Sequence, residues 1–184
     1  KVAKAEIAIT ANNDGPQTFG ETIQGLEDEV LTIDPDLLLS NDLDADATLD
    51  KQKLRIHSVA ESDQYAPVGG RVALVNGKVV FTPTANRNGD ARFTYFAEDG
   101  AGGVSASTVN IKLTAVNDAP NVPQRTFVAQ EDTLLKIKAS QLMANVSDAE
   151  DPVGNLTLSV DLNSVRGGVL LKNYDATVGE DVYT

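Results

Sequence analysis

The feature that most constrains this chain is a repeat of about a hundred residues. Residues 115–120 read Ala-Val-Asn-Asp-Ala-Pro, and residues 11–16 read Ala-Asn-Asn-Asp-Gly-Pro. The interval from Asp14 to Asp118 is 104 residues. Other pairs keep the same interval: Glu27 with Glu131, Asp28 with Asp132, Ile33 with Ile137, Leu38 with Leu142, Asn41 with Asn145 and Asp44 with Asp148. This pattern predicts small tandem domains that meet at the Asn-Asp-x-Pro stretches, where Pro ends a strand.

The repeat divides the chain into five predicted segments. We expect residues 1–10 to be the last strand of a preceding repeat and residues 11–16 to be a linker. Residues 17–115 are predicted to form a complete repeat, residues 116–120 a second linker, and residues 121–184 a partial second repeat. The chain is therefore interpreted as a piece of a longer array.

Composition narrows the possible functions. The chain of 184 residues carries 27 acidic and 15 basic residues, so its net charge is −12. That sign is unsuited to binding nucleic acid or an anionic membrane surface, and we expect neither as a partner. Cysteine is absent, which excludes disulfides and thiolate zinc sites. With His57 as the single histidine, expected to be exposed and structural, no enzyme is predicted.

Short alternating apolar runs, broken by Gly, Asn, Asp and Pro, predict an all-β fold. Strands are expected at residues 30–33, 54–59, 71–75, 78–82, 93–97 and 109–113, and in the second repeat at residues 134–137, 156–158 and 168–171. Leu37-Leu38-Leu39 is interpreted as a turn of helix or a bend. About seven strands per repeat suit tandem β-sandwiches with Greek-key connections.

The strongest local signal is a hairpin around Asn76-Gly77. This dipeptide favours a type I′ turn, whose twist matches that of the flanking strands. The turn sets a register that pairs Leu74 with Val79 and Val72 with Phe81. All four side chains are therefore expected on one buried face.

Acidic residues gather in one loop of each repeat. The first loop contains Asp42, Asp44, Asp46 and Asp50, and its counterpart contains Asp148, Glu150 and Asp151. These carboxylates repel one another unless they bind a cation. Ca²⁺ takes roughly six to eight oxygens from carboxylates, amides and backbone carbonyls, which such loops and the Asn-Asp linkers supply. For Asp50 and Asp151 alone, a merely solvated position is the favoured reading.

An EF-hand is a competing interpretation of the first loop. Asp42, Asp44, Asp46 and Asp50 fall at EF-hand positions 1, 3, 5 and 9. However, Ala47 stands where glycine is required and Lys53 where the bidentate glutamate is required. Since no flanking helices are predicted either, this interpretation is not favoured.

Several motifs together resemble a known family. Ala97-Glu98-Asp99-Gly100, Ser107 to Ile111 and Val116 to Pro120 are similar to the closing part of a cadherin repeat. Glu27-Asp28, Leu38 to Asp46, Phe81-Thr82-Pro83, Asn86 to Gly89 and Asp99 to Gly103 resemble the cadherin-like tandem repeats of large bacterial surface adhesins, including RTX-type ones. The resemblance covers essentially the whole chain and implies cadherin- or immunoglobulin-like sandwiches.

The resemblance also implies calcium at the junctions between repeats. The implied ligands are Asn13, Asp14, Asp44 and Asp46 at the first junction, and Glu27, Asp99, Asn117, Asp118, Asp148 and Glu150 at the second, with an amide oxygen from Asn86 or Asn88. Ala115 stands where a cadherin linker begins with Asp, and Asn86-Arg87-Asn88 replaces an Asp-Arg-Glu motif. Both departures remove ligand charge, which implies fewer or more weakly bound ions.

The function expected from this resemblance is structural. The chain is interpreted as a calcium-stiffened extension module of a secreted bacterial cell-surface adhesin that supports adhesion or biofilm formation. Its expected partners are neighbouring repeats of the same chain, with a host or surface protein or glycan bound through other domains. The alternative is a ligand-recognition sandwich of the same kind of adhesin, which an exposed aromatic cluster around Tyr65 or Tyr174 would favour.

Overall fold

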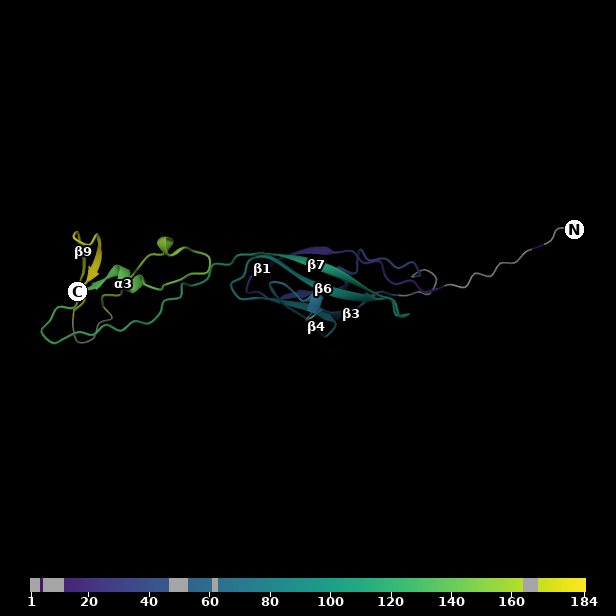
Figure 1. Cartoon of the computed structure of the whole chain (residues 1–184), viewed down its shortest axis with the longest axis horizontal. Coiled ribbons are helices and arrows are strands. Elements are labelled where there is room, and N and C mark those ends of the chain that lie inside the picture. Colours follow the sequence, from purple (N-terminus) through teal and green to yellow (C-terminus); the bar gives the residue numbers. More distant parts are fainter. Residues whose placement is uncertain (1–3, 5–11, 47–52, 61–62, 164–168) are drawn as a thin grey trace. The chain divides into compact units, whose positions relative to one another are not determined.

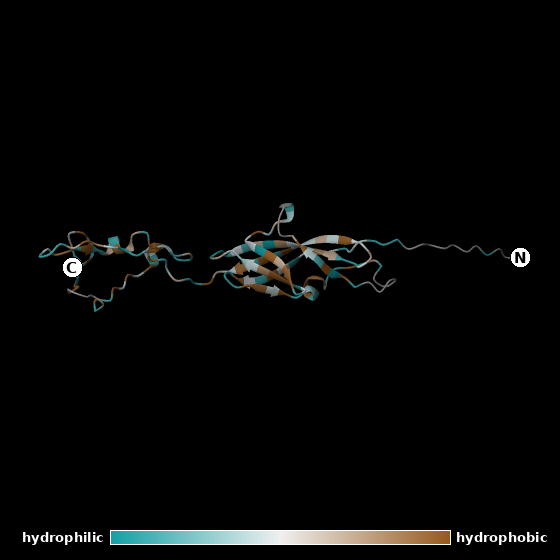
Figure 2. Ribbon diagram, turned by 90° about the horizontal axis from the view of Figure 1, so that it is seen from below, coloured by the Kyte–Doolittle hydropathy of each residue, from teal (hydrophilic) through white to brown (hydrophobic). Residues whose placement is uncertain are grey.

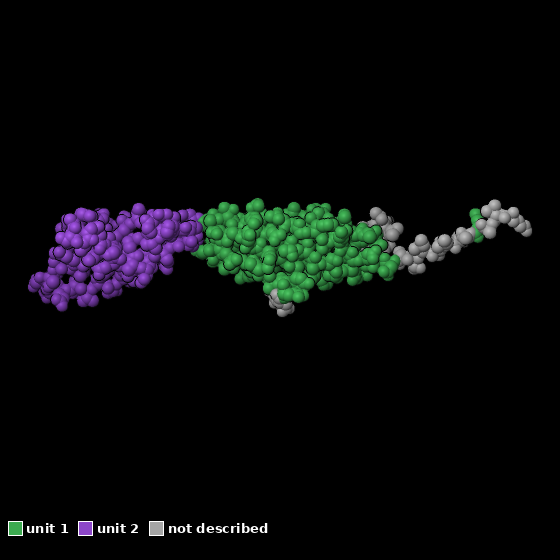
Figure 3. Space-filling view, turned by 45° about the horizontal axis from the view of Figure 1, so that its top comes forward, with its two compact units in different colours: residues 1–116 green, residues 117–184 purple. Residues whose placement is uncertain are grey.

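The structure is a computed structural model, and it describes residues 4, 12–46, 53–60, 63–163 and 169–184 (Figure 1). The chain divides into two compact units, residues 1–116 and residues 117–184 (Figure 3). The strand expected over residues 1–10 lies outside the described residues, apart from Lys4, and so does Asp50. No helix among the described residues is long and apolar enough to cross a membrane.

The first unit is an all-β sandwich of two sheets. Its elements are β1 (Glu21–Leu26), β2 (Leu31–Ile33), α1 (Pro35–Leu38), β3 (Arg55–Val59), the 3-10 turn η1 (Asp63–Tyr65), β4 (Gly70–Val75), β5 (Lys78–Pro83), β6 (Gly89–Glu98) and β7 (Val104–Thr114). One sheet has the order β1-β7-β6-β3 and the other β2-β5-β4. Because the chain crosses between the sheets after β1, β2, β3 and β5, the connections are those of a Greek key.

The core lies between the two sheets (Figure 2). Alternate residues of the long strands face inward: Phe93, Tyr95 and Ala97 on β6, and Val109, Ile111 and Leu113 on β7. The opposite sheet supplies Val72, Val79 and Phe81. Phe81 stacks on Phe93 across the interface, with ring centroids 6.0 Å apart. The strands expected at residues 93–97 and 109–113 are confirmed, as parts of β6 and β7.

The Asn76-Gly77 hairpin has the expected register, with one correction to its burial. Leu74 pairs with Val79 and Val72 with Phe81, and both turn residues have positive φ, 50° and 76°. However, Leu74 remains 38% exposed. The expectation that it is buried is wrong, because β4 is the edge strand of its sheet and Leu74 lies close to the turn.

The second unit forms a smaller sheet of order β8-β10-β9. Its elements are β8 (Ile137–Lys138), α3 (Ala139–Met143), the 3-10 turn η2 (Val153–Asn155), β9 (Lys172–Asp175) and β10 (Glu180–Tyr183). Of the strand expected at residues 134–137, only Ile137 lies in a strand, β8, and the prediction is wrong for residues 134–136. Residues 156–158 and 169–171 belong to no strand, and residue 168 lies outside the described residues. Those strand predictions are therefore wrong for the described positions.

The internal repeat is visible in the backbone pairing of both units. Ile33 pairs with Val79 in the first unit, and Ile137 pairs with Tyr183 in the second, 104 residues later at both partners. The isolated bridge between Gln17 and Leu43 likewise recurs as the bridge between Asn121 and Ser147. Two long-range contacts at one offset show that the repeat is structural as well as sequential.

Candidate metal centre

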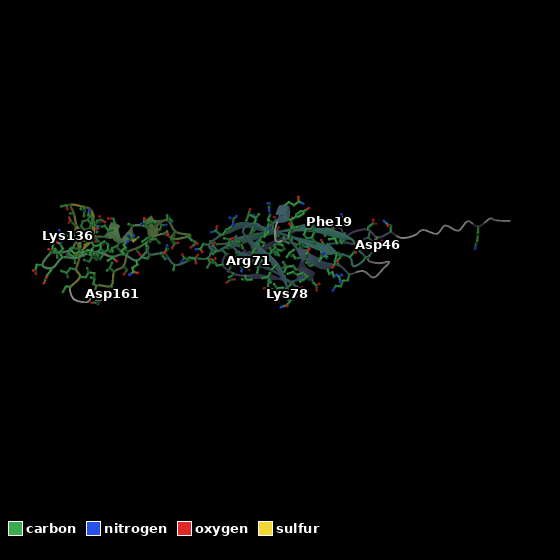
Figure 4. The ribbon with its side chains drawn as sticks, turned by 60° about the horizontal axis from the view of Figure 1, so that its bottom comes forward. Phe19, Asp46, Arg71, Lys78, Lys136 and Asp161 are labelled. Atoms are coloured by element: carbon green, nitrogen blue, oxygen red, sulfur yellow. The ribbon has the colours of Figure 1, made fainter. Side chains whose placement is uncertain are left out.

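The first acidic cluster comprises Asn13, Asp14, Asp44, Asp46 and Asp99, all in the first unit. Hydrogen bonds connect its members in two sets. The amide of Asp14 donates to Asp46 Oδ2 at 2.8 Å, and the amide of Asp46 donates to Asp44 Oδ1 at 2.7 Å. Asn13 Nδ2 donates to Asp99 Oδ2, also at 2.8 Å. Figure 4 shows Asp46 near the end of the first unit that lies opposite Arg71.

The linker reaches this cluster because of the bridge that follows it. The amide of Gln17 donates to the carbonyl of Leu43 at 2.7 Å, and the amide of Leu43 donates back at 3.0 Å. This pairing ties the linker to the acidic loop, so Asp14 lies beside Asp44 and Asp46 although some thirty residues separate them. The structure therefore brings together the four residues that the resemblance implies for this junction.

Asp99 lies in the first cluster rather than beside Glu27. It occupies the turn between β6 and β7, whereas Glu27 accepts a hydrogen bond from Val116, beyond the other end of β7. The 11 residues of β7 separate these positions by roughly 30 Å. The expectation that Asp99 joins Glu27 is wrong, because the β6–β7 turn and the end of β7 lie at opposite ends of the same strand.

Asp99 is held as a buried, ionised carboxylate. Its side chain accepts hydrogen bonds from the amides of Ala101 at 2.7 Å and Gly103 at 3.0 Å. The hydrogen bond from Asn13, followed by those from the turn, holds the pKa of Asp99 below its usual value, although burial acts in the opposite direction. A Cβ at Gly103 would collide with Asp99 Oδ2, so this turn requires glycine there.

Glu27 forms a separate position at the far end of β7. The residue is 0% exposed, and its Oε1 accepts a hydrogen bond from the amide of Val116 at 2.9 Å. Its Oε2 is buried without a hydrogen-bond partner. Close by in the sequence, Asp28 Oδ1 accepts from the amide of Asn86 at 2.9 Å, so the Asn86 loop lies at this end as expected. A buried carboxylate oxygen without a donor is costly unless a cation neutralises it.

The second acidic cluster comprises Asn117, Asp118, Asp148 and Glu150, all in the second unit. The amide of Asp118 donates to Glu150 Oε2 at 3.0 Å, and the amide of Glu150 donates to Asp148 Oδ1 at 3.1 Å. These two bonds repeat those of Asp14, Asp46 and Asp44 at the 104-residue interval. Asn117 differs from Asn13, because its Nδ2 donates to the carbonyl of Asp118.

The chemistry of these positions fits a hard cation that accepts mixed oxygen ligands. Asp44 Oδ2, Glu27 Oε2 and Glu150 Oε1 are buried acceptors without a protein donor. No group of three or more His, Cys, Asp or Glu side chains in the described part of the chain is arranged to hold a metal by itself. A bound ion would therefore need amide or backbone carbonyl oxygens as well, which Ca²⁺ accepts and a thiolate- or imidazole-selective metal does not.

Sequence reasoning missed a polar cluster inside the first unit. Asp42 is 8% exposed, and its carboxylate accepts hydrogen bonds from the amide of Phe19 at 2.8 Å and the hydroxyl of Tyr95 at 2.9 Å. Because both of its carboxylate oxygens accept hydrogen bonds from the protein, Asp42 has a structural role. Both Oε atoms of Glu21 are buried nearby without a partner in bonding geometry. The available signal was Glu21 at an inward position of β1, where it alternates with Ile23.

Burial raises the pKa of Glu21 to about 7, and the charge of Asp42 acts in the same direction. The amide of Asn41 and the hydroxyl of Tyr95 are near enough to oppose this shift in part. The same burial, with the hydrogen bond to Asp42, raises the pKa of the Tyr95 hydroxyl well above its usual value. Tyr95 therefore remains a neutral hydrogen-bond donor in this core.

His57 is exposed and structural, as expected. Its side chain is 52% exposed, and Nδ1 lies 3.2 Å from Glu98 Oε2. Arg55 Nε donates to the other carboxylate oxygen at 2.6 Å. Arg55, His57 and Glu98 thus form a cluster of charged and polar side chains on the surface.

Comparison with known proteins agrees with the fold. A family model described as a cadherin-like domain matches residues 12–114, more than half of the chain. No curated protein matches. Among solved structures, the ectodomain of human desmocollin-1 is similar, with 15% sequence identity and a TM-score of 0.44 over 95% of this chain. The chain spans 31% of the length of that ectodomain. On the family match and the seven-stranded sandwich, this chain belongs to the cadherin-like domain family.

Proposed function

We propose that this chain is a calcium-stiffened extension module of a secreted bacterial cell-surface adhesin, supporting adhesion or biofilm formation. Cadherin-like domains are adhesion-related extracellular modules and generally bind calcium. The observation that carries the proposal is the set of buried carboxylate oxygens without a protein donor, at Glu27, Asp44 and Glu150. All three belong to the ligand sets implied by the resemblance to cadherin-like repeats.

Each acidic cluster combines a linker with the repeat that follows it. Asp14 is bonded to Asp46 in the first cluster, and Asp118 to Glu150 in the second. When bound, Ca²⁺ supplies a positive charge that several oxygens share, so that a carboxylate of the loop and an oxygen of the linker are held together. The hydrogen bonds from the Asp14 and Asp118 amides orient each linker, and a bound cation would offset the repulsion among the carboxylates.

The net charge supports this proposal. The chain carries a charge of −12, which favours accumulation of cations at its surface. Extracellular calcium modules bind with dissociation constants of roughly 10⁻⁴–10⁻³ M, so millimolar calcium is sufficient to occupy them. Binding to the folded state alone stabilises it by about 2.7 kcal/mol when calcium reaches a hundred times its dissociation constant.

Glu27→Gln tests the proposal because calcium reverses its expected effect. In chelator, the variant should be at least as stable as the unchanged chain, since the amide oxygen can still accept from Val116 while an unneutralised buried charge is removed. In 10 mM calcium, the variant should lose most of the calcium-induced rise in melting temperature that the unchanged chain shows.

Glu29→Gln is the matched control, because Glu29 is exposed two residues away and should respond to calcium as the unchanged chain does. Magnesium should stabilise the chain much less, since Mg²⁺ dehydrates reluctantly and demands octahedral geometry. Identical melting curves of the unchanged chain in chelator and in calcium would contradict the proposal. Equal calcium responses of Glu27→Gln and Glu29→Gln would remove Glu27 from the ligand set.

A ligand-recognition module is the second candidate, and one observation favours it. Tyr65 is 44% exposed and packs edge-to-face on Phe96, with ring centroids 5.7 Å apart. The exposed ring of Tyr65, supported by Phe96, offers an apolar face to a sugar ring or a peptide side chain. Chemical-shift changes confined to Tyr65 and Phe96 during titration with oligosaccharides would support this role. Titrations that leave both rings unchanged would argue against it.

A further inference from the structure

The outer face of the β1-β7-β6-β3 sheet contains a polar hollow of about 440 Å³. Because side chains alternate between the two faces of a strand, the exposed neighbours of the buried residues Ala91 and Ile111 point away from the core. The volume lies within the range of roughly 300–1,000 Å³ that is usual for small-molecule sites. The lining includes Thr22, Val68, Asp90, Arg92, Asn110 and Lys112.

The strand register places three polar side chains in one row across this hollow. Asn110 of β7 pairs with Arg92 of β6 on one side and with Thr22 of β1 on the other. Neighbouring strands lie about 4.8 Å apart, so a guanidinium, an amide and a hydroxyl follow one another across the sheet. Val68 continues the row beyond β6, since its amide donates to the carbonyl of Arg92 at 2.9 Å and its carbonyl accepts at 3.0 Å. The row is therefore built on paired backbone at every position.

Arg92 gives the hollow an excess of one positive charge. In the next row, Lys112 forms an ion pair with Asp90 at 2.6 Å, so the charges of these two side chains cancel. The ion pairs among the described residues do not include Arg92, which is exposed. A local positive excess on a chain whose net charge is −12 favours an anionic ligand at this place.

The groups that are available for hydrogen bonding favour a sugar over a peptide. A peptide that adds to a sheet needs a free strand edge, but the backbone of β6 and β7 is engaged in ladders here. Binding must therefore use side chains. The fork of Arg92 matches a carboxylate, while Asn110 and Thr22 can each both donate and accept a hydrogen bond. Sugar hydroxyls also donate and accept, so a sugar ring that bears one carboxylate can use all three side chains.

We propose that this hollow binds a uronic acid residue of an acidic oligosaccharide. The carboxylate pairs with the guanidinium of Arg92, and ring hydroxyls bond to Asn110 and Thr22. Asp90 repels any further negative charge at the same ring, which favours a carboxylate over a phosphate dianion. Phe96 lies on the same strand four residues from Arg92, about 13 Å away, so the hollow is separate from the aromatic pair considered above. The inference depends neither on that pair nor on calcium.

Trigalacturonate is the probe, and its fully methyl-esterified form is the control, which keeps the rings and removes the charge. Each is titrated into the full chain in calcium-free buffer, and the amide and arginine Nε signals are followed by NMR. The acid should shift the signals of Thr22, Arg92 and Asn110 together, and the ester should bind at least tenfold more weakly. Because calcium is absent, this result is independent of whether the calcium proposal succeeds or fails.

Arg92→Gln and Arg55→Gln form a matched pair of variants, because each removes one exposed positive charge from the same sheet. Arg92→Gln should weaken trigalacturonate binding about tenfold, whereas Arg55→Gln should leave it nearly unchanged. Arg92→Lys should also weaken binding, since an ammonium group cannot form two parallel bonds to a carboxylate. Asp90→Asn should tighten binding several-fold because it frees Lys112, a gain that a loss of folding cannot produce.

Several outcomes would overturn the proposal. Equal weakening by Arg92→Gln and Arg55→Gln would show that net charge alone attracts the probe. Equal affinity for the acid and its ester, or no shift at millimolar probe, would exclude a carboxylate site. Shifts confined to Tyr65 and Phe96 would place sugar binding on the aromatic pair instead. Equal or tighter binding of an acetylated triglutamate amide, which has the same carboxylates without ring hydroxyls, would make an acidic peptide the occupant.

Discussion

The two units carry the same acidic loop but differ in how much of a sandwich surrounds it. Asp14, Asp44 and Asp46 are connected by the same two hydrogen bonds as Asp118, Asp148 and Glu150. Yet the first unit has two sheets, whereas the described part of the second has one. The loop geometry therefore does not require a completed sandwich, because its bonds run between a linker and a nearby turn.

Long-range strand pairing behaves differently. β1 and β3 are edge strands with one neighbour each, β7 and β6 respectively. Their equivalents in the second unit, residues 125–130 and 159–163, form no ladders, although the sequence of the latter still alternates, with Val160 and Leu162 two residues apart. Alternation makes a segment able to pair, but the pairing itself depends on a neighbour that supplies backbone donors and acceptors.

The largest effect should come from removing part of the apolar surface that β6 and β7 contribute to the core of the first unit. Phe93→Ala should destabilise the first unit by about 3–5 kcal/mol, because the ring is 1% exposed and stacks on Phe81. Amide exchange in denaturant should show the loss within residues 21–114 and leave β8, β9 and β10 unchanged. Leu74→Ala, at a position 38% exposed, is the control and should cost much less. Equal loss of protection in both units would show that the second unit depends on the core of the first.

A smaller effect should follow from the carboxylate of Glu21, which is buried in the first unit. The second unit carries Arg125 at the equivalent position, 104 residues later. With the pKa of Glu21 raised to about 7 from 4.5, the folded state binds more protons than the unfolded state between those values. Stability of the first unit should therefore fall as the pH rises from about 4.5 to 7 and then level off. Glu21→Gln should remove this slope and stabilise the unit by roughly 1–2 kcal/mol at pH 8.

Denaturant unfolding at a series of pH values measures this effect, with Glu29→Gln as the exposed control. A slope that persists in the Glu21→Gln variant would show that another group produces it. Arg125→Gln should leave the slope of the first unit intact, because that residue belongs to the other unit.

The smallest effect should come from the acidic loops themselves. Asp46→Ala and Glu150→Ala each remove the acceptor for one linker amide, at Asp14 and Asp118. Each should cost about 1 kcal/mol of local stability, measured in chelator as faster exchange of that amide. Similar losses in the two units would support independence of the loop from the sandwich. A loss in the second unit alone would show that the β6–β7 turn, through the hydrogen bond from Asn13 to Asp99, holds the first linker in place.

Much of the local structure could be predicted from the residues. Asn76-Gly77 determined the hairpin register, since a type I′ turn leaves one pairing for the strands on either side. The alternation of Phe93, Tyr95 and Ala97 determined their inward face. The resemblance to cadherin-like repeats, rather than the interval, grouped Asp14, Asp44 and Asp46 at one junction. The hairpin register and the inward face of the strand could be inferred because each depends on residues close in sequence or on a fixed period.

Tertiary structure decided which of these local pieces meet. Asp99 and Glu27 are both acidic residues near the end of a strand, but β7 runs between their positions, and Asp99 joins Asn13 instead. Val72 and Leu74 lie on the same face of β4, yet only Val72 is buried, because β4 is an edge strand and Leu74 lies near the turn. The carboxylate of Glu21 is buried near Tyr95 by the packing of β1 on β7. Turn chemistry and side-chain period act over a few residues, whereas burial and ligand grouping depend on the order of strands in the sheets, which short-range patterns do not specify.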